Sequence, residues 1–521
     1  KNKLWRNFGK ISLPLHKLSA YMDKIIGRDS QFAKLKSYEG SGKSEFIALY
    51  GRRRVGKTSL IRYYFKDKFD FFVSGVLEGE REDQKTAFRA ALQKYGYNGP
   101  TPQNWHEAFA ALGTIVARRK RKKRCVIFID EISCFDIEYS RFVKELGIFW
   151  NNIASWQDNV FLVICGSATS WMIRNVIDNR GGLHRRVTHE MHLRPFSLYQ
   201  SEVYFKAKHF KWDRITILQL YMALGGVPYY FSLLDPSKSA AENIDKLYFA
   251  TDPELKDEFH RLYRSLFSNP EKYMDLIRLL SKSRQGMTRK EISEKLRISS
   301  GEDLSKMLAD LVYCDLISHH SNGGKINSGI YRLTDFFTIF YLTFCNGTVT
   351  DRAFWQHTIN TPVQNTWYGL AFERVCICHI WEIIQSLRLD TILTKYYSWR
   401  SKAANKREES NARIGSTERE QARPQVKKSE PGAQIDLLIE RADGIIDVCE
   451  MKYSRYDYRQ DKDDSRNLAN KIADFEEETQ TRCNIQTVLI TTWGLKENLY
   501  SDEFQKVLTM NDLFVENTED S

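Results

Sequence analysis

The sequence lacks long apolar runs and paired-cysteine motifs. Its longest uninterrupted apolar stretches, such as VFLVIC at residues 160–165, are far below the roughly 20 residues that a membrane-spanning helix needs. The N-terminal stretch has basic residues but no apolar core followed by a small-residue cleavage site, so secretion is not expected. Nine cysteines occur without a CxxC pair, as is typical of reduced thiols. We therefore predict a cytoplasmic protein without a membrane partner.

Acidic residues are fewer than basic ones, 66 against 78, which gives a net charge of +12. Such a surplus suits a polyanionic partner such as nucleic acid. The charge is concentrated in RRKRKKR at residues 118–124, which forms either a solvated face or a contact to a phosphate backbone. At 521 residues and 42% hydrophobic composition, the chain exceeds a single core, so about two to four domains are expected.

Three regions follow one another along the chain. Residues 23–235 alternate short β-rich runs with helical segments, which predicts an α/β domain with a parallel sheet. Residues 240–345 are helical and end in a β-ribbon, and residues 350–515 return to a mixed α/β pattern. Within the third region, residues 401–432 contain no aromatic and few large apolar side chains, so we predict a disordered insert there.

A candidate phosphate loop, GRRRVGKT, lies between the apolar stretch FIALY and the helical stretch SLIRYYF. Its backbone N–H groups and the N-terminus of the following helix can hold the phosphates of ATP. Lys57 would contact the β- and γ-phosphate oxygens, and Thr58 would bind Mg²⁺. The predicted ATP-binding residues are the loop and the residue after it: Gly51, Arg52, Arg53, Arg54, Val55, Gly56, Lys57, Thr58 and Ser59.

Two further apolar strands end in polar residues. RCVIFIDEI places Asp130 and Glu131 at the carboxyl end of a strand, where ligands of open α/β sheets bind. Asp130 would hold Mg²⁺, and Glu131 would orient or deprotonate the attacking water, although acids at strand ends also occur as helix caps. After VFLVICG, Ser167 could sense the γ-phosphate, although serine is also a common turn residue there.

Motifs in this order resemble those of the prokaryotic, archaeal-type AAA-like ATPases that are related to signal-transducing P-loop ATPases. The motifs are IIGRDSQFAKL, LYGRRRVGKTSLI, FIDEI, VICGSATSWM, LRPFS and GGVPYYFSLL. The resemblance runs from about Gly27 to the end of the chain, outside the 401–432 insert, and implies an ATPase core, a winged helix and a C-terminal nuclease-like domain. It also implies a role in nucleotide binding for Arg186, which matches the arginine of a GPLYGRR-like segment. This sequence departs from that segment by reading GGLHRR, without its proline and tyrosine.

The middle region is predicted to be a winged helix-turn-helix. Thr288 and Glu291 form a TxxE capping box for one helix, a leucine stripe marks the core face of the next, and the strands around SNGG would form the wing. The candidate recognition helix is predicted to expose three acids and one lysine: Glu302, Asp303, Asp310 and Lys306. Because such a face is poorly suited to a phosphate-lined groove, packing between domains is favoured over sequence-specific DNA reading.

A hairpin is predicted in the third region. QIDLLIER and IIDVCEMK flank ADG, a three-residue loop whose glycine favours left-handed backbone angles. In this register Asp436 lies directly opposite Glu450, since each is seven residues from Asp443, and such paired Cβ atoms are about 4.5–5.5 Å apart. Lys452 shares the face of Glu450. One surface of the sheet therefore presents two carboxylates and an ammonium group.

These three side chains predict a metal-dependent reaction on a phosphodiester. Like charges directly opposite each other destabilise a hairpin, so Asp436 and Glu450 favour a divalent cation between them, either Mg²⁺ or Mn²⁺. Lys452 could activate or position the attacking water. The arrangement, which follows the helical stretch NTWYGLAFERVC, resembles the PD-(D/E)XK nuclease fold, although Gln434-Ile435 precedes the aspartate without the motif's proline. By this resemblance Glu373 is an auxiliary metal ligand of the catalytic site.

The leading hypothesis is an ATPase that controls a metal-dependent nuclease acting on nucleic acid, with DNA favoured over RNA. The alternative is a nucleotide-gated regulator that binds nucleic acid or a protein through an inactive nuclease fold, in which Lys452 only forms a surface salt bridge with the two acids. A transcriptional regulator that uses the winged helix is a third hypothesis, against which the acidic helix face argues. ATP and Mg²⁺ are the predicted cofactors, with Mn²⁺ as an option at the nuclease site, and a homo-oligomer is predicted as an alternative to a monomer.

Overall fold

The computed structural model describes most of the chain. The described residues are 25–119, 123–137, 140–178, 183, 185–298, 301–322, 325–347, 349–401 and 433–517. Residues 120–122 of the basic run, parts of the GGLHRR and SNGG stretches, and the predicted insert from residue 402 to 432 lie outside them. Within the described residues, no helix combines the length and the apolar character that crossing a membrane requires.

The chain divides into two compact units. Unit 1 consists of the described residues up to Tyr50, Gly56–Gly166 and Trp171–Leu193. Unit 2 consists of Gly51–Val55, Ser167–Ser170 and the residues from Arg194 onward. Two short segments, each of which directly follows a strand of unit 1, therefore belong to unit 2.

Unit 1 is built on a five-stranded parallel sheet. Its strands are, in spatial order, β2 (Phe71–Ser74), β3 (Cys125–Asp130), β4 (Val160–Gly166), β1 (Glu45–Tyr50) and β5 (His189–His192). β1, β3 and β4 are buried almost throughout, as expected for a parallel sheet that is covered on both faces. The predicted α/β fold with a parallel sheet is thus confirmed.

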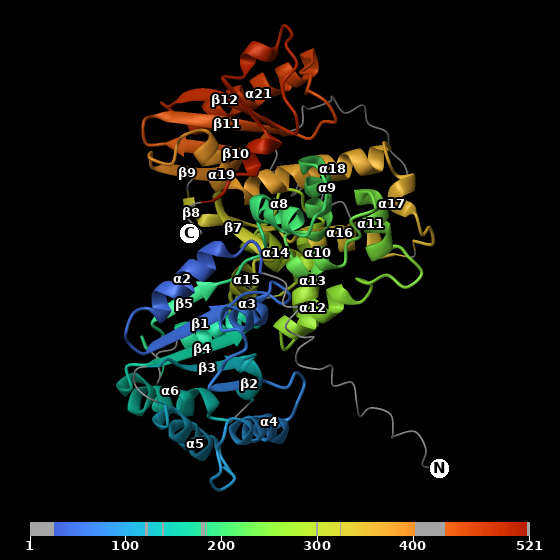
Figure 1. The fold of residues 1–521 in the computed structure, drawn as a ribbon. Coiled ribbons are helices and arrows are strands. Elements are labelled where there is room, and N and C mark those ends of the chain that lie inside the picture. Colours follow the sequence, from blue (N-terminus) through green and yellow to red (C-terminus); the bar gives the residue numbers. More distant parts are fainter. Residues whose placement is uncertain are drawn as a thin grey trace. The chain divides into compact units, whose positions relative to one another are not determined.

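Helices cover both faces of this sheet (Figure 1). On one side lie α2 (Asp29–Glu39) and α3 (Lys57–Tyr64), and on the other α4 (Arg81–Lys94), α5 (Trp105–Ala117) and α6 (Phe142–Asn152). Phe88, Phe109 and Leu146 of the second group share a buried cluster with Phe46 of β1. Shorter helical turns are η1 (Ile132–Phe135), η2 (Ala154–Trp156), α7 (Thr169–Met172) and η3 (Ile173–Ile177). Because the strands are parallel, β1, β3 and β4 all end at the same edge of the sheet.

Unit 2 is mainly helical in its first part. Its first helices are α8 (Leu198–Ala207), α9 (Arg214–Leu224), α10 (Pro228–Ser232), α11 (Ala240–Tyr248), α12 (Glu258–Leu266) and α13 (Pro270–Ser281). The middle elements are β6 (Met287–Thr288), α14 (Arg289–Leu296), α15 (Glu302–Tyr313), β7 (Ile317–Asn322), β8 (Lys325–Leu333), α16 (Phe336–Phe340) and η4 (Tyr341–Cys345). The last part contains α17 (Phe354–His357), α18 (Pro362–Cys378), α19 (Ile380–Ser386), β9 (Thr394–Arg400), β10 (Gln434–Arg441), β11 (Ile445–Lys452), α21 (Lys462–Thr479), β12 (Asn484–Thr491), η5 (Ser501–Glu503), β13 (Lys506–Thr509) and η6 (Met510–Leu513).

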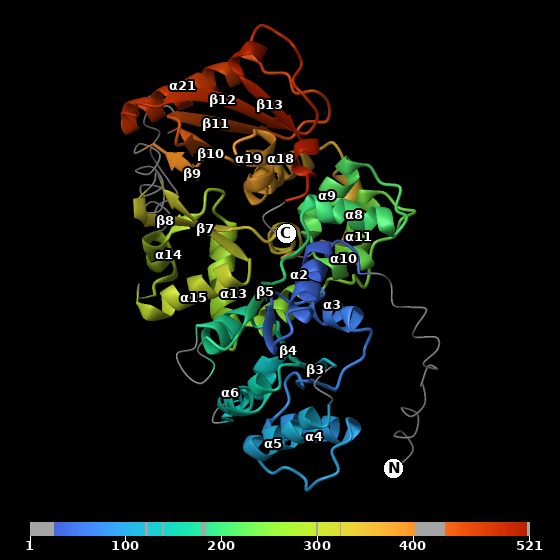
Figure 2. The ribbon, with the colours of Figure 1, turned by 60° about the vertical axis from the view of Figure 1, so that its left-hand side comes forward.

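A mixed eight-stranded sheet runs through unit 2 in the order β13-β12-β11-β10-β9-β7-β8-β6. β10 pairs antiparallel with β9 and β11, and β12 and β13 continue parallel to β11. The hairpin β7–β8 joins the same sheet through the pair Asn322↔Ser398. On the β9–β13 part of the sheet, α21 covers one face, and α18 and α19 cover the other (Figure 2).

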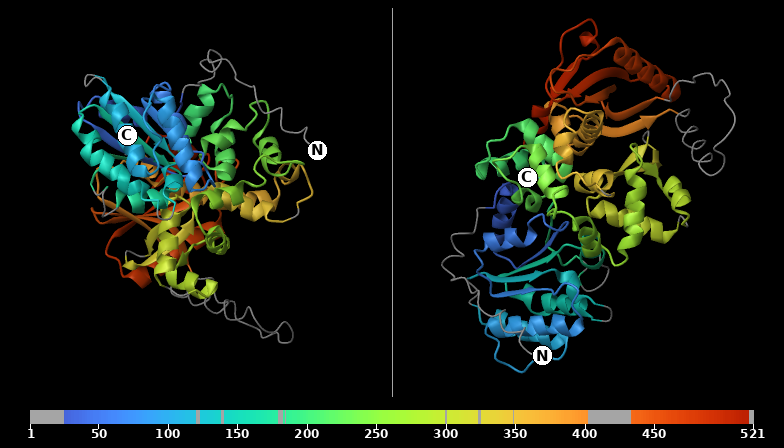
Figure 3. Two further views of the ribbon diagram at one scale, coloured as in Figure 1. Left: turned by 90° about the horizontal axis from the view of Figure 1, so that it is seen from below. Right: turned by 90° about the vertical axis from the view of Figure 1, so that its right-hand side faces the viewer.

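The middle region of unit 2 consists of helices followed by the β7–β8 hairpin. The helices of residues 270–313 gather in one group, which is yellow in the right-hand view of Figure 3. The predicted capping box is confirmed, because Glu291 Oε2 accepts the Thr288 N–H at 2.6 Å and Thr288 Oγ1 accepts the Glu291 N–H at 3.3 Å.

One prediction about α15 is wrong. Glu302, Asp303 and Lys306 are exposed as expected, but Asp310 is only 2% exposed. Its carboxylate accepts a 2.6 Å hydrogen bond from the Tyr273 hydroxyl of α13. Helical periodicity does not reveal a polar partner on a neighbouring helix, and Tyr273 is such a partner for Asp310.

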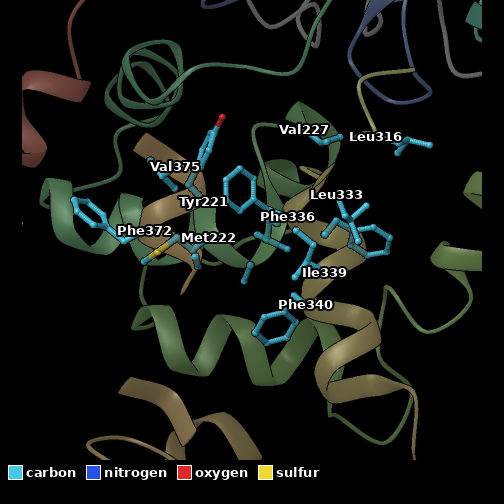
Figure 4. Close-up of a cluster of buried hydrophobic side chains, with 14 of the residues drawn as sticks. Tyr221, Met222, Val227, Leu316, Leu333, Phe336, Ile339, Phe340, Phe372 and Val375 are labelled. Carbon is cyan, nitrogen blue, oxygen red and sulfur yellow. The ribbon is translucent and has the colours of Figure 1, made fainter. Parts of the chain in front are cut away.

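The core of unit 2 joins α9, α16 and α18 (Figure 4). Its buried side chains include Tyr221 and Met222 of α9, Phe336, Ile339 and Phe340 of α16, and Phe372 and Val375 of α18. The rings of Phe340 and Trp367 meet edge to face, with centroids 5.2 Å apart. Leu437 of β10 and Cys449 of β11 belong to the same cluster. One continuous core therefore connects α16 with the sheet that carries the predicted carboxylates.

Two arginines of the GRRRVGKT stretch pair with acids elsewhere in unit 2. Arg52 is 1% exposed and forms an ion pair with Asp335, which is the N-cap residue of α16. Burial lowers the pKa of Arg52, but the charge of Asp335 outweighs that effect and the pKa is raised. Arg54 Nη1 lies 2.8 Å from Glu258 Oε2 of α12. These ion pairs fix the first half of the loop within unit 2.

Replacing Arg52 with methionine is expected to lower the free energy of unfolding by about 3–5 kcal/mol, because Asp335 would stay buried without its cation. Arg53→Met is the matched control in the same loop. Because Arg53 is partly exposed, its loss should cost less than about 1 kcal/mol. Urea unfolding followed by tryptophan fluorescence measures both values, and equal costs would show that the Arg52–Asp335 pair does not anchor the loop.

Candidate active sites

The GRRRVGKT stretch forms a curled loop between β1 and α3. Three of its residues have positive φ angles, namely Gly51 (143°), Arg54 (71°) and Gly56 (95°). Gly56 is the N-cap residue of α3, and Lys57 is the first residue of the helix. The helix N-terminus therefore opens directly onto the loop, which is the arrangement that holds phosphate groups with backbone N–H donors.

The loop and the end of β3 bring two predicted residues into contact. Thr58 Oγ1 donates a 2.8 Å hydrogen bond to Asp130 Oδ2, and Asp130 and Lys57 are each 4% exposed. Burial raises the pKa of Asp130, the neighbouring Glu131 carboxylate raises it further, and the Thr58 hydrogen bond partly opposes this. The adjacent hydroxyl and carboxylate are hard oxygen donors, so they fit Mg²⁺, and the buried ammonium of Lys57 fits a phosphate ligand.

Glu131 begins a sharp turn after β3. Its φ angle is 47°, in the left-handed region that non-glycine residues rarely adopt. Such backbone conformations persist where the surrounding structure enforces them, and they are frequent at active sites. The conformation therefore agrees with the predicted role of Glu131 beside Asp130 without testing that role.

The other predicted nucleotide-binding residues differ in their exposure to solvent. Ser59 is exposed in the first turn of α3, and Arg186 is exposed in the turn before β5. Ser167 is 6% exposed and follows β4 directly. Ser167 and the residues Gly51–Val55 belong to unit 2, whereas Lys57, Thr58 and Asp130 belong to unit 1.

The second candidate site is on the α21 face of the unit 2 sheet. The β10–β11 register pairs Leu437 with Cys449 and Glu440 with Ile446. Continued by one residue, this register sets Asp436 opposite Glu450, as predicted. The Gly444 φ angle of 82° is the left-handed conformation expected of the hairpin loop.

Glu450 is held by two lysines. Its carboxylate oxygens lie 3.2 Å from Lys452 Nζ and 3.0 Å from Lys471 Nζ of α21. Burial raises the pKa of Glu450, but the two ammonium groups outweigh that effect, so the pKa is lowered. Lys452 Nζ also lies 3.6 Å from Asp464, and the two acids together raise its pKa despite burial. Lys452 is therefore positively charged at neutral pH.

Asp436 and Glu373 are two further carboxylates of this site. Asp436 Oδ1 accepts a 2.6 Å hydrogen bond from Gln434 Nε2 and lies 3.8 Å from Arg332 Nη2. Burial, followed by the charge of Asp436, raises the pKa of Glu373 to about 7. Raising a carboxyl pKa in this way indicates that negative charge at the site is not fully compensated.

A cavity of about 1090 Å³ opens at these residues and is lined by Glu373, Asp436, Glu450, Lys452 and Lys471, among others. Among the described residues, no three Asp, Glu, His or Cys side chains are gathered in the arrangement of a metal site. Asp436 and Glu450 nevertheless fit Mg²⁺, which commonly binds through one or two carboxylates while water and substrate oxygens complete its shell.

Several residues of this cavity were missed by sequence reasoning. Lys471 and Asp464 come from α21, on the same helix face as the buried Leu468 and Phe475. Asp464, Leu468, Lys471 and Phe475 follow one another at spacings of four, three and four residues. This helical spacing is a signal that could have identified Asp464 and Lys471. Arg284, which also lines the cavity, comes from the middle region, and nothing in the local sequence links it to the hairpin.

Comparisons with known proteins support the ATPase part of this description. Residues 26–234 match a family described as an ATPase domain predominantly from Archaea. An uncharacterized protein of Methanocaldococcus jannaschii is 23% identical over 386 residues, which is 72% of this chain and 81% of that protein. The family match and the phosphate loop together support a P-loop ATPase domain that binds ATP.

Solved structures with low sequence identity are also similar. A Walker-type ATPase of Pyrococcus abyssi is 17% identical to this chain, and its structure matches with a TM-score of 0.43. The matched region covers 61% of this chain and 96% of that one. The ORC2 protein of Aeropyrum pernix, solved in complexes with ADPNP and ADP, is 13% identical to this chain, and its structure matches with a TM-score of 0.35. The matched region covers 68% of this chain and 98% of that one.

The raised pKa of Glu373 predicts a pH-dependent effect of Glu373→Gln. The pKa of Glu373 is about 7 in the folded state, against an ordinary value of 4.5. As pH rises, the unfolded state therefore loses this proton before the folded state does. The wild-type protein loses stability as pH rises from about 4.5 to about 7. The variant lacks this loss, so its advantage in thermal unfolding midpoint, measured without divalent cations, should be larger at about pH 8 than at about pH 5. Glu497→Gln, at an exposed carboxylate, is the control. An advantage that is independent of pH would contradict the assignment.

Proposed function

We propose that this chain is an ATP-dependent switch that controls a metal-dependent nuclease site acting on nucleic acid, with DNA favoured over RNA. ATP would bind at the loop of residues 51–58. The nuclease site would be the cavity around Asp436, Glu450 and Lys452. Residues 350–515 would form a PD-(D/E)XK nuclease-like domain.

The observation that carries this proposal is that part of the phosphate loop belongs to the same unit as the carboxylate–lysine cavity. Gly51–Val55 and Ser167–Ser170 belong to unit 2, which also holds the carboxylate–lysine cavity. These segments include the start of the phosphate loop and the candidate γ-phosphate sensor Ser167. A change in the occupancy of the ATP site would therefore act directly on residues of unit 2.

At the ATP site, Mg²⁺ held by Thr58 and Asp130 would neutralise charge on the β- and γ-phosphates. Lys57 would bind the phosphate oxygens, and the α3 N-terminus would add backbone N–H donors. Glu131 would orient the attacking water and accept its proton. The raised pKa of Asp130 supports a cation at this position, because a cation would offset the burial of its charge.

At the second site, a divalent cation held by Asp436 and Glu450 would neutralise charge on the phosphodiester. Lys452 is already charged, so it would act by binding and polarising the phosphate rather than by taking a proton. Glu373 would complete the acidic set, and its raised pKa supports a cation there. Lys471 would have to release Glu450 when the cation binds.

We also propose a winged helix for the middle region, formed by α13–α15 and the β7–β8 hairpin. The order of helices and hairpin supports it. Because β7 joins the sheet of the nuclease-like region through Asn322, the favoured role of this region is packing beside that site. The exposed Glu302 and Asp303 argue against insertion of α15 into a DNA groove.

One observation favours the alternative of a nucleotide-gated binding protein with an inactive nuclease fold. Glu450 is neutralised by Lys452 and Lys471, so the protein itself satisfies the charge that a metal would otherwise balance. In this alternative the cavity would bind nucleic acid or a protein without cutting.

Cleavage of labelled single- and double-stranded DNA and RNA, with Mg²⁺ or Mn²⁺ and with or without ATP, tests the proposal. Lys452→Ala should reduce cutting by at least about 100-fold, because it removes a fixed charge at the phosphate. Lys57→Ala should abolish ATP hydrolysis and remove the effect of ATP on cutting. Lys462→Ala, at an exposed lysine of α21, is the matched control and should leave both activities unchanged.

The result that contradicts the nuclease is a wild-type protein that hydrolyses ATP but cuts no substrate under any of these conditions. Cutting that is equal with and without ATP would instead contradict the switch.

A further inference from the structure

A second cavity adjoins the carboxylate–lysine cavity. It has a volume of about 510 Å³, and Arg284, in the loop after α13, lines both cavities. The apolar wall of the second cavity includes Ile339 and Phe344 near α16, and Trp367 and Leu370 of α18. A volume of this size is within the range of sites that bind small organic groups.

Arginines are concentrated where the two cavities meet. Arg284 and Arg374 line the second cavity, and both act on the charge of Glu373. Arg332 Nη2 lies 3.8 Å from Asp436 Oδ1. Three guanidinium groups are therefore gathered beside Glu373 and Asp436.

Arg374 of α18 is half-buried and lines the second cavity. Its Nη1 donates to the Leu370 carbonyl at 3.4 Å. Its Nε is buried and has no hydrogen-bond partner among the residues that the structure describes. A half-buried guanidinium whose buried Nε–H has no acceptor favours an anionic ligand that supplies both charge and acceptor atoms.

The second cavity combines guanidinium groups with an apolar wall, and one kind of ligand fits both. Guanidinium groups bind phosphate oxygens, and apolar and aromatic walls bind the flat face of a base. A nucleotide combines both, and the adjoining cavity already suits a phosphodiester. Because Arg284 lines both cavities, the two cavities adjoin each other.

We propose that Arg284, Arg374 and the apolar wall formed by Ile339, Phe344, Trp367 and Leu370 are a subsite for one nucleotide of the bound strand. The phosphate lies on the two arginines and the base lies against the apolar wall. This nucleotide flanks the phosphodiester that lies at Asp436 and Glu450. The assignment rests on the proposed nucleic-acid substrate of the larger cavity.

The test uses binding rather than cutting. A fluorescein-labelled single-stranded DNA is titrated with the full chain in EDTA over a series of salt concentrations. Arg284→Gln and Arg374→Gln should each weaken binding and reduce the slope of log K against log salt by about 0.7, the value for one lost phosphate contact. Arg388→Gln, at an exposed arginine, is the matched control and should leave the slope unchanged.

The base contact is tested separately at the rim of the wall. Val363 lines the cavity and is 49% exposed, so Val363→Glu places a charge in the subsite without disturbing the core. It should weaken binding of the normal strand about tenfold, as expected for the loss of one base contact. It should weaken binding of a strand with abasic positions less, because only the repulsion between the new carboxylate and the phosphates remains. Val349→Glu, at another exposed valine, is the control.

The outcomes separate this subsite from the proposed function. If the wild type cuts DNA while both arginine variants bind with the wild-type slope, the subsite is refuted and the nuclease stands. If the wild type binds free dAMP in this cavity but no strand, the subsite belongs to a small ligand and the proposal is overturned. If the wild type neither binds nor cuts any strand, the proposed function fails and the subsite fails with it.

Discussion

The buried ion pair between Arg52 and Asp335 is the constraint that holds residues 51–55 of the phosphate loop in place within unit 2. A guanidinium that is 1% exposed is tolerated only with a charged partner and further hydrogen bonds. Asp335 meets this requirement and also accepts the Thr338 N–H at 3.1 Å as the N-cap of α16. The same carboxylate therefore fixes both the phosphate loop and the start of a core helix. Any displacement of the loop has to move α16 or break the pair.

From α16 the packing is continuous to both cavities. Phe340 contacts Trp367 of α18, and Ile339 and Trp367 line the smaller cavity. Farther along α18, Glu373 lines the larger one. Closely packed cores transmit displacements instead of absorbing them. We propose that this is the physical route by which ATP at the loop changes the carboxylate–lysine site, with α16 as the element that both sites bias.

Local patterns in the sequence predicted the parts of the sites that depend on short-range geometry. The approach of Thr58 to Asp130 follows from two parallel strands that end at one sheet edge, and the pairing of Asp436 with Glu450 follows from the length of the hairpin loop. The pairing of Arg52 with Asp335 was not predictable, because the two residues are 283 positions apart and neither lies in a pattern that indicates the other. For the same reason the burial of Asp310 and the clustering of Arg284, Arg332 and Arg374 required the tertiary structure.

The most direct test of the account is amide hydrogen exchange in α16, measured by mass spectrometry with and without ATP and Mg²⁺ in the wild type and in Lys57→Ala. If nucleotide binding acts on unit 2 through Arg52 and Asp335, ATP will change the exchange of the amides at Thr338 and Ile339 in the wild type and not in Lys57→Ala. The account is contradicted if ATP protects the amides of the phosphate loop while exchange in α16 stays the same.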